Sequence, residues 1–189
     1  MAVPLFVFMG ITLEKAKIAE DLLTNLSQLF GKFRGGLGIS VTIVGMLLAA
    51  STGIVGATVV TMGLMSLPSM LKRGYDPSLA AGTICASGTL GQIIPPSIVL
   101  VLLGDVLSSA YSQAQLDSGI FSPDTVSVGD LFVGALVPGL LLVLCYIFYI
   151  FILSIIRPEL MPALEADDME PPRIINVLKA LLPPLILIF

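Results

Sequence analysis

Two short stretches combine Ser, Thr and Gly inside otherwise apolar sequence, and their oxygen atoms are the ones that could do chemistry. The first is Ser51-Thr52-Gly53, and the second contains Ser87, Gly88, Thr89, Gly91, Pro95, Pro96 and Ser97. Gly and Pro break helices, and a break frees backbone carbonyls that can coordinate a small hard cation such as sodium. Hydroxyls add neutral oxygen ligands, and helix N-termini at a break favour an anionic group. The pattern predicts a sodium and substrate site, with sodium held by hydroxyls and carbonyls near Ser87, Gly88 and Thr89.

A packing kink between membrane helices is the alternative for either stretch taken alone, because small and hydroxyl residues also occur at such kinks. Two breaks in one chain, the second running from Ser87 to Ser97, favour a site over two kinks. Pro95 and Pro96 fix two φ angles and remove two N–H donors, so they either stiffen the loop and orient Ser97 or only separate two helices. The apolar core carries no acidic residue, which favours sodium coupling over a proton relay.

The composition argues against catalysis by this chain. Hydrophobic residues make up 56% of it and charged residues only 12%, with no histidine and two cysteines. The apolar residues gather in long runs, as in proteins that sit in a lipid bilayer. A Ser-His-Asp set, a phosphate-binding loop and a metal cluster are all missing from the sequence, so we predict no enzyme and no cofactor beyond sodium as coupling ion. The absence of a basic stripe also excludes nucleic acid as a partner.

Residues 37–71 form an apolar run that is too long for one ordinary span, which takes about 20 residues, and too short for two. Basic residues flank the run on both sides: Lys32, Arg34, Lys72 and Arg73. The positive-inside rule places such flanks in the cytoplasm. Segment 37–73 is therefore predicted to be a re-entrant helical hairpin with its tip near residues 51–56, which requires that the tip be buried in protein or line a cavity.

The other segments follow from hydrophobicity and charge in the same way. Asp76-Pro77 begins a short helix, 77–86, which leads through the second Ser/Gly/Pro stretch into an apolar helix at about 97–110. No Lys or Arg occurs between 104 and 130, so that part is expected outside the cytoplasm. The prediction is an all-α integral membrane protein, and a piece of a longer one. Its predicted segments follow in chain order: 1–36 (a helix end and an amphipathic arm helix), 37–73 (the hairpin), 74–113 (a broken transmembrane helix), 114–130 (an outer loop), 131–156 (a transmembrane helix), 157–176 (a cytoplasmic linker) and 177–189 (the start of another helix).

Several motifs carry a family resemblance in their order along the chain. They are Val3-Pro4-Leu5-Phe6-Val7, Arg34-Gly35-Gly36-Leu37, Lys72-Arg73-Gly74-Tyr75-Asp76-Pro77, the run from Ala86 to Ser97, Gly129-Asp130-Leu131-Phe132 and Pro138-Gly139-Leu140-Leu141. Together they resemble the N-terminal half of the large membrane subunit of tripartite ATP-independent periplasmic (TRAP) transporters.

The resemblance implies a sodium-driven symporter of the bacterial inner membrane that takes up small organic acids. It implies two partners, a small four-helix membrane subunit and a periplasmic solute-binding protein. It also implies the first of two inverted repeats in an elevator-type transporter, with residues 114–130 periplasmic and the Lys/Arg-bearing loops cytoplasmic. Two departures stand out: Ser51-Thr52-Gly53 has fewer hydroxyls than the family's Ser-Gly-Ser-Ser, and the outer loop, 105–127, is longer and either contacts the binding protein or is a surface insertion.

Two other functions remain open from the sequence. A passive channel or permease could use the same broken helices as a filter. A membrane scaffold subunit without a transport pathway is the second, although unwinding inside a bilayer brings a scaffold no benefit.

Overall fold

A computed structural model of the chain describes residues 18–31 and 33–163, together with isolated positions 4, 8, 11, 12 and 182. The predicted helix end in segment 1–36 and the predicted segments beyond residue 163 lie largely outside this range. Within it every regular element is a helix: α2 (Ile18–Phe30), α3 (Gly36–Thr52), α4 (Val55–Lys72), α5 (Pro77–Thr89), the 3₁₀ turn η1 (Leu90–Gln92), α6 (Ile98–Asp117), α7 (Val128–Ile156) and the 3₁₀ turn η2 (Pro158–Leu160).

Helices α3 and α4 form an antiparallel hairpin around a two-residue turn, Gly53-Ile54. Gly53 adopts φ 62°, a left-handed conformation that glycine reaches without steric cost, and its N–H donates to the Ala49 carbonyl at 3.0 Å. The turn falls within the stretch 51–56 in which we expected the tip. Its depth in a membrane stays a prediction.

The amphipathic helix α2 packs on α3 rather than standing in solvent. Its apolar stripe, Ala19, Leu22, Leu23 and Leu26, is buried in one core with residues of α3 and α4. Acidic Glu20 and Asp21 lie in its first turn, where they complement the positive end of the helix dipole. Residues 18–30 therefore use their apolar stripe to pack against a helix of the same chain.

Helix α5 starts as predicted at Asp76-Pro77. The Asp76 carboxylate accepts hydrogen bonds from the backbone N–H groups of Ser78 (3.0 Å) and Leu79 (3.1 Å), and Pro77 occupies the first turn. The helix continues to Thr89, three residues past the predicted end, and passes directly into η1. An irregular segment follows before α6 begins at Ile98.

Two boundaries differ from the prediction. Helix α6 runs to Asp117, so the first residues of the predicted loop 114–130 are helical and the non-helical connection is 118–127. Helix α7 begins at Val128 rather than 131, because Ser127 and Asp130 form a capping box that satisfies the first N–H groups. Absence of basic residues marks a side of the membrane, not the end of a helix, which is why the charge pattern placed these ends wrongly.

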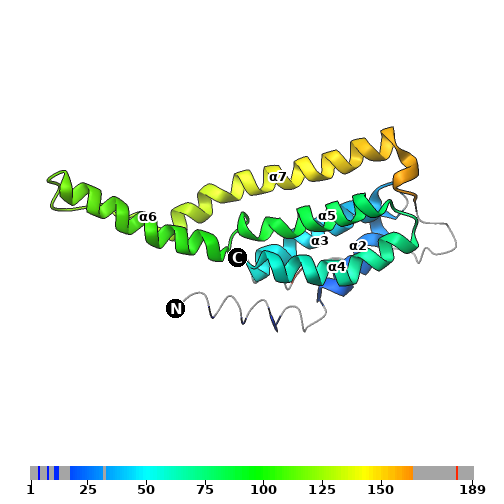
Figure 1. The fold of residues 1–189 in the computed structure, drawn as a ribbon, viewed down its shortest axis with the longest axis horizontal. Helices are drawn as coiled ribbons and strands as arrows, with labels where there is room; N and C mark the ends of the chain where they lie inside the picture. The colour runs from blue at the N-terminus through cyan, green and yellow to red at the C-terminus, as the bar shows by residue number, and fades with distance from the viewer. Residues whose placement is uncertain are drawn as a thin grey trace.

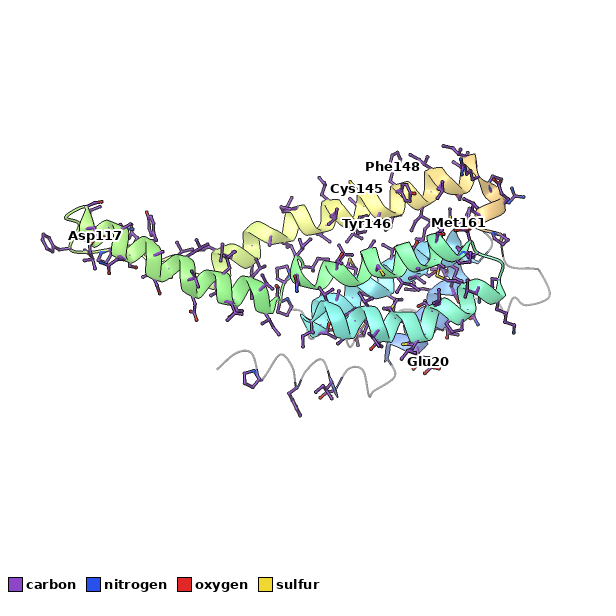
Figure 2. All side chains as sticks on the ribbon, viewed as in Figure 1. Glu20, Asp117, Cys145, Tyr146, Phe148 and Met161 are labelled. Carbon is purple, nitrogen blue, oxygen red and sulfur yellow. The ribbon has the colours of Figure 1, made fainter. Side chains whose placement is uncertain are left out.

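Two described helices, α4 and α7, are long and apolar enough to cross a membrane. Helix α7 lies along α3 and α5 on one side of the bundle, while α6 extends away from it (Figure 1). Figure 2 shows Cys145 and Phe148 on the side of α7 that faces away from α5 and Tyr146 on the side toward it. Both cysteines are exposed in this chain.

The basic residues of the described segments gather at the end of the bundle opposite the hairpin turn. A Cβ on Gly35 would lie 3.1 Å from Ser154 Cβ and 3.5 Å from Met161 Sδ, so the start of α3 touches the end of α7. The Asp76 N–H donates to the Leu160 carbonyl at 3.1 Å, which ties the start of α5 to η2. This end carries Arg34, Lys72, Arg73 and Arg157, as expected if it faces the cytoplasm.

Candidate functional site

Four helix ends meet where the hairpin turn touches the irregular segment after η1 (Figure 1). They are the C-termini of α3 and α5 and the N-termini of α4 and α6. A Cβ built on Gly53 would lie 3.4 Å from the Pro96 carbonyl oxygen and 3.5 Å from the Ile98 nitrogen, which is van der Waals contact. The two stretches singled out in the sequence are therefore one place in the fold. We call residues 51–54 and 87–98 the junction.

Helices α3 and α5 run parallel and approach closely through small residues. A Cβ on Gly45 would lie 2.6 Å from Ser87 Cβ, and a Cβ on Gly91 would lie 2.8 Å from the Ala49 carbonyl oxygen. Any larger residue at Gly45 or Gly91 would force the helices apart, and small residues serve the same purpose between membrane helices. These contacts bring the C-terminal ends of both helices to the same level.

Gly88 makes the corresponding contact with α4. A Cβ there would clash with Val59 Cγ2 and would approach Val59 Cα and the Val59 nitrogen to 3.2 Å, which is tighter than most real Cβ contacts. Helix α5 thus presents Ser87 to α3 and Gly88 to α4. The roles of Gly88 and Gly91 in close packing are visible only in the structure, since the sequence indicated them as helix breakers.

Three of the predicted hydroxyls donate to carbonyls of their own helices. Ser51 Oγ donates to Leu48 O at 2.8 Å, Ser87 Oγ to Ile84 O at 3.0 Å, and Thr89 Oγ1 to Ala86 O at 2.7 Å. A hydroxyl has one proton and two lone pairs, so each of these oxygens is left able only to accept. Such oxygens suit a cation. Ser51 and Ser87 are buried, whereas Thr89 is exposed.

Thr52 pairs with a residue that the sequence did not single out. Its Oγ1 lies 2.6 Å from Thr58 Oγ1, and Thr58 Oγ1 donates to the Ile54 carbonyl at 2.9 Å. Because Thr58 donates its hydroxyl proton to Ile54 O, Thr52 is the donor in the hydrogen bond between the two threonines. Thr58 is 1% exposed. The sequence feature that could have identified Thr58 is its position, one helical turn after the predicted break.

Ser97 holds the irregular segment together rather than facing the hairpin. Its Oγ donates to the Gln92 carbonyl at 2.9 Å and accepts from the Leu100 N–H at 3.3 Å, so it closes the loop onto η1 and caps α6. The preceding Pro95–Pro96 peptide is cis. Five of the predicted residues make contacts between segments: Gly53, Ser87, Gly88, Gly91 and Pro96. Ser97 fixes the loop that carries Pro96.

No group of three or more His, Cys, Asp or Glu side chains in the described part of the chain could hold a metal ion. A cavity of about 480 Å³ lies elsewhere, between α5 and α7, with Thr83, Tyr146 and Arg157 among its lining residues. None of the ten predicted site residues lines this cavity. The polar groups of the junction are uncharged hydroxyl and carbonyl oxygens, together with the helix ends.

A family model described as "Tripartite ATP-independent periplasmic transporter, DctM component" matches residues 1–189. The chain belongs to this family. The resemblance inferred from the motifs is therefore confirmed.

Curated relatives agree with the family assignment. The chain is 38% identical over 157 residues to the C4-dicarboxylate TRAP transporter large permease protein DctM of Vibrio cholerae. The aligned residues cover 83% of this chain and 31% of that protein. It is 32% identical over 141 residues to the isethionate TRAP transporter permease protein DctMQ of Oleidesulfovibrio alaskensis (75% of this chain, 20% of that protein). It is 29% identical over 157 residues to the ectoine TRAP transporter large permease protein TeaC of Halomonas elongata (83% of this chain, 33% of that protein).

The chain spans about a third of the length of the DctM proteins it matches, which is less than the half that the motifs indicated. The relatives are transporter permeases and not enzymes, in agreement with the sequence-based expectation. No solved structure matches the chain significantly.

Proposed function

We propose that this DctM chain forms part of the sodium and substrate site of a secondary transporter that takes up small organic anions, chiefly carboxylates. The observation that carries the proposal is the junction, where two helix breaks from distant parts of the sequence touch at Gly53 and Pro96. Secondary transporters build their sites from discontinuous helices of this kind. Sodium coupling, substrate class and mechanism are the proposed parts.

The electrostatics of the junction suit a cation and an anion side by side. Helix C-termini carry partial negative charge and N-termini partial positive charge. At the junction α3 and α5 contribute C-termini, and α4 and α6 contribute N-termini. Acceptor oxygens of Ser51, Ser87 and Thr89 accompany the C-terminal ends and favour sodium, whereas the N-terminal ends at Val55 and Ile98 favour a carboxylate.

The membrane arrangement is proposed from the same features. The α3–α4 hairpin would be re-entrant, and α5, η1 and α6 would form one broken crossing with the junction near the bilayer midplane. The full-length transporter would sit in the bacterial inner membrane and move its transport domain like an elevator. It would work with a small four-helix membrane subunit and a periplasmic solute-binding protein, as the word tripartite in the family description suggests.

The substrate class rests on the relatives. Their names specify C4-dicarboxylate, isethionate and ectoine. A small organic acid carrying a carboxylate is the class that the two helix N-termini at the junction favour.

Uptake by the purified full-length transporter in proteoliposomes tests the proposal. With the binding protein outside, an inward sodium gradient is expected to accumulate radiolabelled carboxylate above its outside concentration, and an equal potassium gradient is not. Equilibration without accumulation would indicate a passive channel. Binding of the partners with no solute movement under either gradient would indicate a scaffold.

Cysteine labelling in whole cells tests the topology separately. In a full-length transporter with Cys85 and Cys145 replaced, single cysteines are placed at Arg34, Lys72 and Ser118, which are exposed positions. An impermeant thiol reagent is expected to label only the Ser118 position. Labelling of Arg34 and Lys72 from opposite sides would mean that the α3–α4 unit crosses the membrane, and the site assignment at Ser51–Gly53 would be lost with it.

A further inference from the structure

The turn between α3 and α4 brings the free backbone groups of two helix ends to the junction. An α-helix leaves its last carbonyls and its first N–H groups without partners inside the helix. At the end of α3 the Gly53 N–H donates to the Ala49 carbonyl at 3.0 Å, and the first bond of α4 runs from the Thr58 N–H to the Ile54 carbonyl at 3.2 Å. The carbonyls of residues 50–53 follow the last bond of α3 and carry the negative end of its dipole.

One side chain of α4, Thr58, reaches back across this turn. Its Oγ1 donates to the Ile54 carbonyl at 2.9 Å, which adds to the bond from its own N–H to the same oxygen. Both lone pairs of the Ile54 oxygen are thus occupied, and this carbonyl is directed into α4. Thr58 Oγ1 also lies 2.6 Å from Thr52 Oγ1, whose proton it accepts. Thr58 therefore links the last residue of α3 to the first turn of α4.

The bond to Thr58 determines what the Thr52 hydroxyl can do. It uses the single hydroxyl proton of Thr52, so the lone pairs that remain make Thr52 Oγ1 an acceptor only. Thr52 is the last residue of α3, next to the free carbonyls. Its side chain is 8% exposed, whereas Thr58 is 1% exposed and lies behind it. A cation at the end of α3 can therefore reach the Thr52 oxygen and not the Thr58 oxygen.

The first turn of α4 is itself fixed by α5. A Cβ built on Gly88 would clash with the Val59 side chain, so Val59, next to Thr58, rests directly on the α5 backbone. Thr58 thus belongs to a helical turn that packing keeps in place, and through Thr58 this turn fixes Thr52. The predicted hydroxyls of α5 donate within their own helix, so their orientation does not depend on Thr58.

We propose that Thr58 is a positioning residue for the sodium site: it holds the Thr52 oxygen ready as a cation ligand and does not bind the ion itself. This inference rests on the proposed function and adds to it the residue that sets the sodium affinity at the end of α3. Without the Thr58 hydroxyl, the Thr52 proton has no fixed acceptor and the oxygen loses its orientation. The Thr52 side chain must then be ordered when the ion binds, which lowers affinity.

The sodium dependence of uptake by the full-length transporter in proteoliposomes tests the inference. Thr58→Val keeps the shape of the side chain and removes the hydroxyl. The half-saturating sodium concentration is expected to rise about five- to ten-fold, which corresponds to one lost hydrogen bond, with an unchanged rate at saturating sodium. Thr58→Ser keeps a hydroxyl and should restore the unmodified value. Thr83→Val is the matched control, because the Thr83 hydroxyl also donates to a carbonyl four residues earlier, but in α5.

A double variant separates positioning from direct binding. Thr52→Val removes the proposed ligand, so adding Thr58→Val to it should raise the half-saturating sodium concentration no further. Effects that multiply in the double variant would mean that Thr58 binds the ion independently, and would overturn the inference. If Thr58→Val does not fold, Thr58→Cys replaces it, since a thiol is a weaker hydrogen-bonding group and should give a smaller rise of the same sign.

The remaining outcomes distinguish this inference from the proposed function. Sodium-driven uptake with the same half-saturating sodium concentration in the Thr58 variants and the unmodified protein would overturn the positioning role while the transport function stands. A lower saturated rate with unchanged half-saturation would also overturn it, because Thr58 would then support only the structure. Uptake by the unmodified protein that does not depend on sodium would overturn both.

Discussion

The junction and the arm, which is residues 105–127, are built in opposite ways. Each includes an irregular segment, and in the arm this is 118–127, after the end of α6. At the junction, glycines 45, 88 and 91 allow backbones to touch, and the hydroxyls of Ser51, Ser87 and Ser97 are buried. On the arm, the contacts are local, between Gln115 and Asp124, and Phe121 is 90% exposed. The junction joins segments that are far apart in sequence, whereas the arm is held by its own residues.

The difference predicts different consequences of mutation. A change at the junction disturbs several helices together, so its effects on folding and on ion binding should appear jointly. A change on the arm should leave folding and sodium binding intact and alter only what the arm touches.

Gly88→Ala should give the largest loss of stability. Its new methyl group would lie 3.2 Å from Val59 backbone atoms and would push α5 from α4, at a cost of about 1–3 kcal/mol for overpacking. Thermal unfolding of the purified full-length protein in detergent should show a lower Tm. Gly82→Ala is the matched control in the same helix, because nothing lies within 4 Å of a Cβ there. Equal Tm values for the two variants would contradict close packing at the junction.

The Thr52–Thr58 pair should show a coupling of about 1 kcal/mol in a double-mutant cycle. Either change to Val removes one partner of a buried 2.6 Å hydrogen bond. Thr58→Val leaves the Thr52 hydroxyl without its acceptor, which costs about 1–3 kcal/mol, whereas after Thr52→Val the Thr58 hydroxyl still donates to Ile54 O. The double variant should cost less than the sum of the singles. Unfolding free energies of the four proteins provide the measurement, and additive losses would mean that the two hydroxyls are not paired.

Gln115→Ala should have the smallest effect on global stability, below about 1 kcal/mol, because the bonds it removes are local to the arm. Amide hydrogen exchange at Asp124 should become faster, since its N–H loses the Gln115 acceptor. Gln113→Ala is the control, as Gln113 donates only to the exposed Asp117 carboxylate. Unchanged exchange at Asp124 would show that the Gln115 side chain does not hold the Asp124 backbone in place.

Some local features of the fold followed from local features of the sequence. Asp76-Pro77 predicted a helix start because capping depends on adjacent residues, and the Ser/Gly/Pro stretch predicted the irregular segment before α6 for the same reason. The end of α6 was missed because charge reports the side of a membrane and not helix length.

Contacts between distant segments could not be derived from one sequence. Nothing in the spacing of Gly45 and Ser87 shows that α3 and α5 lie parallel and touch there. Thr58 escaped notice for a similar reason, since its partner is set by the geometry of the Gly53-Ile54 turn. The order of motifs, which does not depend on such contacts, was sufficient for the family.

Sodium-dependent thermal stabilisation of the full-length transporter tests the junction site most directly. A ligand that binds only the folded state raises its stability by about 2.7 kcal/mol at one hundred times its Kd. The unmodified protein and Thr83→Val, whose hydroxyl bonds within α5 away from the junction, should show a higher Tm in sodium chloride than in equimolar potassium chloride. Thr89→Val should lose most of that difference. An equal sodium-dependent shift in Thr89→Val and Thr83→Val would contradict sodium binding by the Thr89 hydroxyl and, with it, the assignment of the junction.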